Sequence, residues 1–294
     1  MRYYTDSDTL FIRGSFCAAS TGFFGGIHSV STILSHTVPE GASHRSKEKE
    51  LEFAAAGAGV GSDFFGLLTG VPARQISVLQ YDFITVFIAA GIPENGSSEA
   101  AGINIIVCSG EGMEDAALLE AIMVATEAKT EALLTSGYAT SGTPADAVIA
   151  AYEGPVIHTG AGRNTEVGRR IRKAVLHGIL EAGRRSREND GQDRPSFFIF
   201  SRFKGEHWVE WTPGNCPYFP CHFPGQRCDF CYCPFYPCHD ETLGQWAESP
   251  NGKKVWNCAR CTLVHEPPVA DYLRQFPEAS LKELVRQRKT GQEK

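Results

Sequence analysis

The sequence lacks the features that mark membrane, secreted and nucleic-acid-binding proteins. It begins Met1-Arg-Tyr-Tyr-Thr-Asp-Ser-Asp8, without a basic segment followed by an apolar core, and no later apolar run is long enough to span a bilayer. Positive charge is not in excess, because 28 Lys and Arg residues stand against 34 Asp and Glu residues, for a formal net charge of -6. We therefore expect a cytoplasmic protein without membrane or nucleic-acid partners.

Several catalytic motifs are also missing. Before residue 184 the chain has no Gly-x-Ser-x-Gly elbow, no His-Glu-x2-His zinc motif and no Gly-x4-Gly-Lys-Ser/Thr loop. The Gly-x-Gly at 160–162 has no third glycine at the spacing of a dinucleotide fingerprint. A serine-hydrolase triad, a metalloprotease site and a nucleotide-binding loop therefore cannot be assigned by motif.

The first 183 residues carry alternating strand and helix patterns. Short apolar runs bounded by turn residues predict strands at 9–13, 83–90, 103–108 and 145–152. Helical periodicity with capping residues predicts helices at 46–58, 113–136 and 165–182, the last ended by Gly183. Strands interleaved with helices predict a layered α/β (α+β) domain.

The chain divides where its composition changes. Residues 184–196 are polar, lack an apolar anchor and follow a predicted helix end, which is typical of a linker. The residues after them are rich in aromatic side chains, proline and cysteine and have little helical periodicity. We predict four parts: an α/β domain at 1–183, the linker at 184–196, a small cysteine-rich metal-binding domain at 197–275 and a charged tail at 276–294. The residues from Leu281 to Lys294 are expected to form a short helix that frays at its end.

One lysine lies on the wrong face of a predicted helix. In the helix at 113–136, Lys129 falls near the middle of the apolar face, and Thr126 and Thr130 accompany it on that inner side. A buried ammonium needs partners, and Asp146, at the start of an apolar strand, is the expected one. Two alternatives stay open: the lysine snorkels past a loosely packed helix end, and the aspartate only caps the turn before it.

Three glycine-containing loops and two histidines are further candidates for ligand contacts. The loops are 20–26, 141–143 and 158–164, and glycine lets backbone N–H groups approach a ligand closely. The last loop leads into a helix, whose N-terminus could hold an anionic group. His36 and His158 could act as general acid or base near neutral pH. Glycine-rich turns and single histidines are, however, more often structural.

Five short segments of the first predicted domain form an ordered set. They are Ile33-Leu-Ser-His-Thr-Val-Pro39, Ala101-Gly-Ile-Asn104, Ala125-Thr-Glu-Ala-Lys-Thr-Glu-Ala-Leu133, Ser141-Gly-Thr-Pro-Ala-Asp-Ala147 and Tyr152-Glu-Gly-Pro155. Together they resemble the adenosylcobinamide amidohydrolase family, from about residue 20 to residue 182. The resemblance implies hydrolysis of the linear amide that joins aminopropanol to the corrin ring, giving adenosylcobyric acid in corrinoid salvage. The corrinoid is then a substrate and not a cofactor.

The resemblance also implies which residues carry the reaction. Amide hydrolysis needs an activated nucleophile, a donor for the oxyanion and an acid for the leaving amine. The residues that match shared motifs and have suitable chemistry are Lys129, Asp146, Thr143 and Glu127. Lys129 and Asp146 are the organising pair, and Thr143 or an activated water is the nucleophile. Substrate contacts, including backbone oxyanion contacts from the two adjacent glycines, are expected from Thr21, Gly25, Gly26, His36, Asn104, Ser141, Gly142 and His158.

Two positions depart from the pattern of that family. Its usual Gly-Thr-Ile-Asn reads Ala101-Gly-Ile-Asn104 here, and its usual Thr-Ala-Gly turn reads Ala89-Ala90-Gly91. Each change removes a hydroxyl group. Neither position can therefore supply the nucleophile in this chain.

Eight of the ten cysteines lie in a short region with an internal repeat. Cys216-Pro-Tyr-Phe-Pro-Cys-His222 recurs as Cys233-Pro-Phe-Tyr-Pro-Cys-His239, and Cys-x2-Cys pairs lie at 228–231 and 258–261. The Cys-x2-Cys spacing is a strong zinc signal, and eight thiolates would saturate about two structural zinc ions. The expected ligands are Cys216, Cys221, Cys228, Cys231, Cys233, Cys238, Cys258 and Cys261, with His222, His239 and His265 as possible substitutes. An iron–sulfur cluster is the first alternative and disulfides the second.

The cysteine-rich region leaves the function open to other classes. It is similar to a cysteine-rich small domain associated with proteins of corrinoid metabolism. A zinc ion held by four thiolates has no open coordination position, so such a module is expected to be structural or to bind a protein partner. Besides a corrinoid amidohydrolase, the sequence therefore admits a non-catalytic corrinoid-binding or chaperone protein and a zinc-dependent interaction protein.

Overall fold

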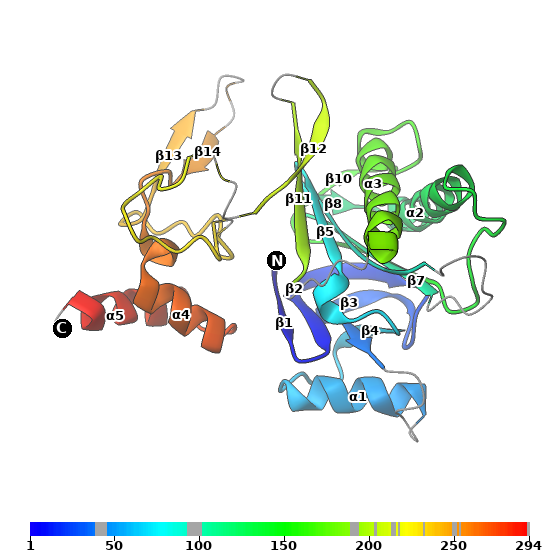
Figure 1. The fold of residues 1–294 in the computed structure, drawn as a ribbon, viewed down its shortest axis with the longest axis horizontal. Helices are drawn as coiled ribbons and strands as arrows, with labels where there is room; N and C mark the ends of the chain where they lie inside the picture. Colours follow the sequence, from blue (N-terminus) through cyan, green and yellow to red (C-terminus); the bar gives the residue numbers. More distant parts are fainter. Residues whose placement is uncertain are drawn as a thin grey trace. The chain divides into compact units, whose positions relative to one another are not determined.

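The computed structural model describes residues 1–38, 46–92, 102–188, 194–202, 205–212, 216, 218–231, 233–248, 252 and 254–292. The chain forms two compact units (Figure 1). The first unit holds Met1 and Tyr3–Trp211, and the second holds Arg2 and Thr212–Lys294. Each unit has its own apolar core, so each is described by itself.

One ten-stranded mixed sheet forms the centre of the first unit. Its strands are β1 (Arg2–Asp6), β2 (Thr9–Ser20), β3 (Gly26–Thr37), β4 (Phe64–Thr69), β5 (Ser77–Tyr81), β6 (Ile84–Gly91), β7 (Gly102–Ser109), β9 (Ala147–Tyr152), β11 (Ser196–Ser201) and β12 (His207–Glu210). They are arranged in the order β12-β11-β5-β6-β7-β9-β2-β3-β4, and β1 pairs with β2. β7 and β9 are parallel neighbours at the centre, so the starts of both strands meet at one edge of the sheet.

Two long helices cover one face of the sheet, as Figure 1 shows. They are α2 (Asp115–Thr135) and α3 (Glu166–Glu188), which pack against each other and against the strands. Their apolar faces share one core with β6 and β7, for example Leu118, Ile171 and Val107, all fully buried. Full burial of such a side chain contributes roughly 1.5–3 kcal/mol, so this core fixes α2 firmly over the central strands.

The opposite face of the sheet packs on itself. Ile33 of β3, Val78 of β5 and Ile106 of β7 belong to a single buried cluster, although β3 and β5 stand far apart in the strand order. The sheet therefore curls until its two halves meet. Burial on both faces explains the nearly uninterrupted apolar sequences of β6 and β7.

A third helix covers the outside of the curled sheet. This helix, α1 (Lys47–Gly57), packs Leu51 and Ala55 onto Phe11, Leu34 and Phe64. Ser46 caps its N-terminus by accepting a hydrogen bond from the backbone N–H of Lys49. Two short strands, β8 (Gly112–Met113) and β10 (Val156–His158), form a separate parallel pair.

The α/β class and the three helices predicted for the first domain are confirmed. The helix predicted to stop at Gly183 continues to Glu188, because Arg184 and Arg185 both bind Glu181 within the last turns. Arg185 also binds Ser196 and Glu210, which holds the end of the helix against β11 and β12. These ion pairs therefore stabilise helical residues beyond Gly183, which the sequence indicates as the end of the helix.

The boundary between the units differs from the predicted one. Residues 184–188 of the predicted linker are helical, 189–193 lie outside the described residues, and β11 begins at Ser196. β11 pairs with β5 and β12 with β11, so residues up to Trp211 belong to the first unit. The reason is burial: Phe198 is 3% exposed in the α2–α3 core.

The second unit combines a hairpin, loops and two helices. Strands β13 (Gln245–Glu248) and β14 (Lys254–Asn257) pair antiparallel, and the helices are α4 (Pro267–Gln275) and α5 (Leu281–Gln292). Leu263, Leu273 and Leu284 form its small core. The short helix predicted from Leu281 is confirmed as α5, and it packs on the unit because Leu284 is fully buried.

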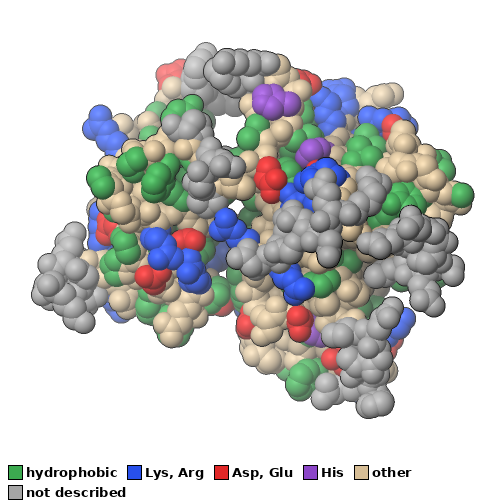
Figure 2. Space-filling model, viewed as in Figure 1, with side chains coloured by type: hydrophobic (Ala, Val, Ile, Leu, Met, Phe, Trp, Pro, Cys, Tyr) green, Lys and Arg blue, Asp and Glu red, His purple; other side chains and the backbone are tan. Residues whose placement is uncertain are grey.

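Charges of both signs lie close together on the surface. Figure 2 shows Lys and Arg beside Asp and Glu on the face in view. Asp82, for example, binds both Arg170 and Arg202 at 2.7 Å. In the part of the chain that the structure describes, no helix has the length and apolar character needed to cross a membrane.

Candidate functional site

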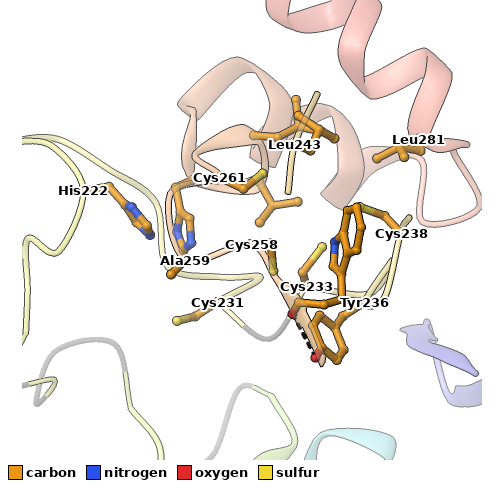
Figure 3. A pocket seen from close by; sticks show the side chains of 14 residues that line it. His222, Cys231, Cys233, Tyr236, Cys238, Leu243, Cys258, Ala259, Cys261 and Leu281 are labelled. Atoms are coloured by element: carbon orange, nitrogen blue, oxygen red, sulfur yellow. Dashed lines mark hydrogen bonds between the residues drawn. The ribbon is translucent and has the colours of Figure 1, made fainter. Parts of the chain in front are cut away.

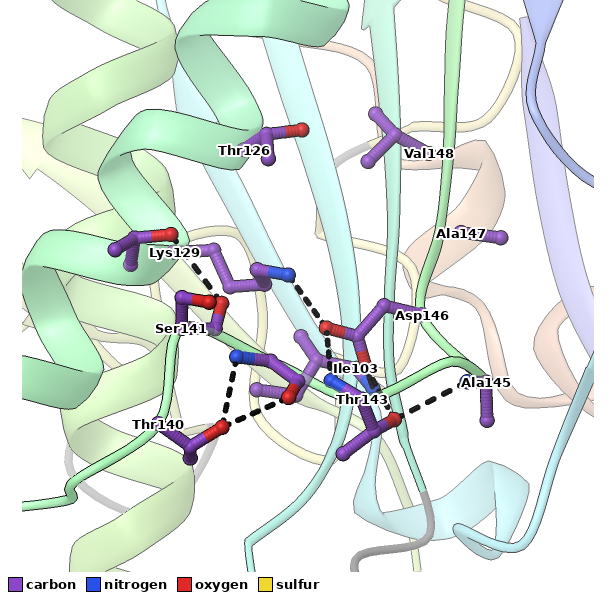
Figure 4. Close-up of polar contacts among 12 residues, drawn as sticks. Ile103, Thr126, Lys129, Thr140, Ser141, Thr143, Ala145, Asp146, Ala147 and Val148 are labelled. Carbon is purple, nitrogen blue, oxygen red and sulfur yellow. Dashed lines mark hydrogen bonds and ion pairs between the residues drawn. The ribbon is translucent and has the colours of Figure 1, made fainter.

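The predicted pair of Lys129 and Asp146 is present in the structure. Lys129 lies on the sheet-facing side of α2, and Asp146 immediately precedes β9 (Figure 4). The Nζ of Lys129 is 2.5 Å from Oδ2 of Asp146, and the two side chains are only 8% and 9% exposed. The lysine therefore does not snorkel to solvent. Burial of both charges is tolerated because each has a partner of opposite sign.

Asp146 accepts four hydrogen bonds, which fix its carboxylate. Its Oδ1 accepts from the backbone N–H of Ile103 at 2.8 Å and from the hydroxyl of Thr143 at 2.9 Å. Its Oδ2 accepts from Lys129 and from the backbone N–H of Thr143 at 3.2 Å. Both sequence hypotheses for this aspartate are therefore correct, since it pairs with the lysine and also caps the turn before β9.

The turn in front of Asp146 requires a glycine. Gly142 has φ +145°, and a Cβ on it would lie 2.3 Å from both Lys129 Nζ and Asp146 Oδ2. The hydroxyl of Thr140 accepts from the N–H of Gly142 and donates to its carbonyl oxygen. The hydroxyl of Thr130 donates to the Ser141 carbonyl at 3.2 Å, which ties the turn to α2. The backbone can therefore pass this close to the buried pair only because position 142 has no side chain.

Thr143 connects the buried pair to solvent. Its hydroxyl donates to Asp146, accepts from the N–H of Ala145 at 3.2 Å, and belongs to a partly exposed residue. A hydroxyl hydrogen-bonded to a carboxylate is the arrangement from which a base can withdraw the proton of a nucleophile. The site thus has a buried charged interior, and the hydroxyl on its carboxylate belongs to a residue that is partly exposed.

Asn104 and Thr21 stand beside the pair but are engaged with backbone. Asn104 is 3% exposed, donates to the Leu68 carbonyl at 2.7 Å and accepts from the N–H of Ala147 at 3.1 Å. Thr21 exchanges hydrogen bonds with both backbone groups of Val148. These contacts join β4 and the loop after β2 to the starts of β7 and β9. They position the walls of the site, and substrate contact by either residue stays a prediction.

The glycine-rich turn after β2 is tight. A Cβ on Gly25 would lie 2.5 Å from the Ser20 carbonyl oxygen, and Gly26 has φ +122°. Both positions therefore need glycine for the hairpin between β2 and β3. Their predicted role as oxyanion contacts is a separate matter and stays a prediction.

The two candidate histidines are engaged elsewhere. His36 Nδ1 lies 2.7 Å from the Thr9 hydroxyl and its Nε2 lies 3.8 Å from Glu50 of α1. Burial lowers the pKa of His36, although Glu50 acts in the opposite direction. His158 Nε2 lies 2.7 Å from Glu111. In the described part of the chain, neither histidine shares a hydrogen bond or ion pair with the Lys129 and Asp146 group.

Two glutamates of α2 lie apart from the buried pair. Glu120 accepts hydrogen bonds from the backbone N–H groups of Ala161 and Gly162 at 2.6 and 2.8 Å. The loop expected to hold a ligand anion therefore binds a carboxylate of the chain itself. Glu127 is exposed, as is Thr126, and among the described contacts neither joins the buried pair. The periodicity of α2 gave no indication of the role of Glu120, which depends on the loop geometry.

Eight of the ten thiols lie in the second unit, and they fall in chain order into two sets of four. The first thiol group is Cys216, Cys221, Cys228 and Cys231, and the second thiol group is Cys233, Cys238, Cys258 and Cys261. Burial raises the pKa of Cys231 to about 11, and the other three thiols of its group add to the rise. Burial likewise raises the pKa of Cys233 to about 11, and the thiols that interact with it are the rest of the second thiol group. All ten cysteines are free thiols, so the disulfide alternative has no support.

A cavity of about 220 Å³ lies beside the second thiol group (Figure 3). All four thiols of that group line it, together with His222, Cys231, Trp256 and His265. The Nε1 of Trp256 is buried and has no hydrogen-bond partner among the described residues. Four thiols around one cavity suit a metal of tetrahedral thiolate preference such as zinc. Among the described residues, however, no three His, Cys, Asp or Glu side chains already stand close enough to hold an ion.

The fold and the first site together define a class. An α/β domain presents a hydroxyl that donates to a carboxylate, and that carboxylate is paired with a buried ammonium. These are the kinds of group that amide hydrolysis uses as nucleophile, base and cation. Residues 10–191 match the family model for adenosylcobinamide amidohydrolase. The chain belongs to the adenosylcobinamide amidohydrolase family.

Curated relatives match parts of the chain. The adenosylcobinamide amidohydrolase of Methanosarcina mazei is 39% identical over 191 residues, which are 61% of this chain and 96% of the relative. Residues 207–288 match a cysteine-rich small domain. An uncharacterized protein of Methanocaldococcus jannaschii is 57% identical over 63 residues, 21% of this chain and 53% of its own length. A probable cobalt-factor III C(17)-methyltransferase of Methanothermobacter thermautotrophicus is 44% identical over 62 residues, 21% of this chain and 17% of its own. No solved structure matches the chain.

Proposed function

We propose that the protein hydrolyses the amide between aminopropanol and the corrin ring of adenosylcobinamide, releasing adenosylcobyric acid and 1-amino-2-propanol. The observation that carries the proposal is the buried Lys129–Asp146 pair with the Thr143 hydroxyl on the same carboxylate. All three residues lie within the segment that matches the amidohydrolase family model. The Methanosarcina mazei relative bears the name of this activity.

The geometry suggests a role for each residue. The Thr143 oxygen, or a water held by it, attacks the amide carbon while its proton passes to Asp146, 2.9 Å away. The described contacts use one of the three N–H donors of Lys129, so the remaining donors can stabilise the negative oxygen of the intermediate. The proton on Asp146 then passes to the amine nitrogen as the C–N bond breaks. If Thr143 is the nucleophile, a water molecule finally hydrolyses its ester.

The experiment is direct incubation of purified protein with adenosylcobinamide. Mass spectrometry should detect adenosylcobyric acid and 1-amino-2-propanol in equal amounts. Binding of the corrinoid without release of the amine would instead identify a corrinoid-binding protein. The absence of any corrinoid affinity would instead favour an interaction protein that functions through its cysteine-rich unit.

We further propose that the cysteine-rich unit holds about two structural zinc ions, each by four thiolates. The support is the donor set of eight thiols and the unpartnered indole N–H in the cavity. Zinc would release the thiol protons and draw the ligands together, which adds to the stability of the unit. Elemental analysis of the purified chain tests this. Detection of iron together with visible absorption would instead assign an iron–sulfur cluster to the unit.

A further inference from the structure

We infer that the eight cysteines divide in chain order into two separate metal sites, the first thiol group and the second thiol group, and that the Gln226 amide orients two ligands of the first site. The inference rests on the proposed metal binding of the cysteine-rich unit. It adds which thiols share an ion and which residue outside the ligand set supports them. The main alternative joins like motifs, with one ion between the two Cys-Pro-x-x-Pro-Cys turns and another between the two Cys-x2-Cys pairs.

Gln226 links the two motifs of the first thiol group. Its Nε2 donates to the sulfur of Cys221 at 3.3 Å and to the sulfur of Cys228 at 3.2 Å. One cysteine belongs to the Cys-Pro-x-x-Pro-Cys turn and the other to the Cys-x2-Cys pair that follows it. A side chain that reaches both sulfurs requires these two motifs to be neighbours, as the division in chain order demands.

The orientation of this amide is fixed by backbone. Oε1 of Gln226 accepts from the N–H groups of His222 and Phe223 at 2.8 and 3.3 Å, so the NH₂ group must face the sulfurs. The residue is 5% exposed and its donors are held in place. N–H donors on metal-bound sulfur stabilise the thiolate and fix its direction, which is the usual task of residues around a metal ligand.

The four thiols of the second thiol group all line one cavity, and Cys231 of the first thiol group also reaches it. Cys233 and Cys238 come from the second copy of the turn, Cys258 and Cys261 from the second Cys-x2-Cys pair, and all four line the cavity of Figure 3. Trp256 lines the same cavity, and its buried Nε1 has no acceptor among the described residues. A thiolate on a metal ion would offer that acceptor. A buried donor without a hydrogen bond is costly, so metal binding that brings a thiolate to this N–H would stabilise the unit.

The two sites repeat one local pattern. The N–H of Phe219 donates to the Cys216 carbonyl and that of Tyr236 to the Cys233 carbonyl, at 3.2 and 3.0 Å. In the Cys-x2-Cys pairs, the N–H of the second cysteine donates to the carbonyl of the first, at 3.4 Å in one pair and 2.9 Å in the other. Each repeat therefore supplies a complete four-thiol set from one continuous stretch of chain.

Two four-fold variants of the full chain separate the alternatives. Variant one carries C216A, C221A, C228A and C231A; variant two carries C228A, C231A, C258A and C261A. Division in chain order predicts about one zinc per chain in variant one and none in variant two, from about two in the parent. Pairing of like motifs predicts the reverse, and that result would overturn the inference. So would a parent chain that binds no metal. The counts are independent of amide hydrolysis, so failure of the proposed activity would not affect them.

Gln226→Glu tests the supporting residue without removing a thiol. It keeps the acceptor for His222 and Phe223 but replaces the NH₂ donor by a carboxylate oxygen. In a background with C258A and C261A, which leaves the first site alone, it should weaken retention of the remaining ion against a chelator by about 10- to 100-fold. Gln245→Glu, at an exposed position of β13, is the matched control and should change nothing. Equal retention in both variants would remove Gln226 from the site.

Discussion

Replacing Lys129 by methionine tests the buried pair most directly. Methionine keeps an unbranched side chain of similar length and removes the ammonium, so the packing of α2 is retained. Asp146 would keep three of its four hydrogen bonds, from Ile103 and Thr143. Breaking a fully buried ion pair costs about 3–5 kcal/mol, and the retained donors reduce the expected loss of unfolding free energy to roughly 1–3 kcal/mol. The variant should therefore remain folded.

The assay combines a thermal unfolding curve with aminopropanol release from adenosylcobinamide. Lys129→Met is expected to lose about 10²- to 10⁴-fold in turnover, the usual effect of removing one catalytic group. Lys173→Met is the matched control. Lys173 lies on α3 in an exposed pair with Glu206, and such solvent-screened pairs contribute little to stability. It should leave both unfolding and turnover close to those of the parent.

The double variant separates charge from stability. Asp146→Asn alone should also lose turnover, because the amide cannot take a proton from the nucleophile. Lys129→Met combined with Asp146→Asn leaves neither charge unpaired and should regain part of the lost stability while remaining inactive. Near-normal turnover in Lys129→Met, or recovery of turnover together with stability in the double variant, would refute a chemical role for the pair.

Three further predictions address the same unit. Gly142→Ala should abolish turnover and lower the melting temperature, because its Cβ would collide with Lys129 and Asp146 at a positive φ. Thr143→Val should be inactive if the hydroxyl is the nucleophile or holds the water, whereas Thr143→Ser should retain measurable turnover; equal rates in both would exclude that hydroxyl. A chain truncated after Trp211 should fold and hydrolyse, while one ending at residue 191 lacks β11 and β12 and should unfold at lower temperature in calorimetry.

The buried pair could be predicted because a charge on an apolar helix face violates the helical pattern. The period of α2 placed Lys129 inward. Asp146 was the expected partner because it is a polar residue at the start of an apolar segment. The same reasoning misplaced Thr126, which is exposed and bonds to its own helix backbone. Helical periodicity predicts the direction of a side chain only to within a fraction of a turn. Thr126 is predicted near the edge of the inner face of α2, so a small error places it outside.

The strands that were missed depend on distant partners. β3 and β4 are parallel neighbours, and β11 pairs with β5 across more than half of the first unit's sequence. The sequence of β3 mixes polar and apolar residues, whereas β4 (Phe64–Thr69) and β11 (Ser196–Ser201) are short apolar runs. A short apolar run does not by itself distinguish a strand from another buried segment. For Phe198, burial arises from the aromatic stack of His177 with Trp208, which brings together residues of α3 and β12. Composition alone assigned this stretch to the cysteine-rich domain.

Glu120 and Gln226 illustrate a second limit on sequence reasoning. Each acts by accepting from two consecutive backbone N–H groups of a turn, and neither breaks a pattern in its own element. The φ and ψ angles of a turn decide which of its N–H groups point outward. Glycine and proline in such turns change those angles. A polar side chain that serves another segment's backbone is therefore visible only after both segments are folded. Residues of this kind hold the glycine-rich loop before α3 and the turn between Cys221 and Cys228, although no pattern in the sequence indicates them.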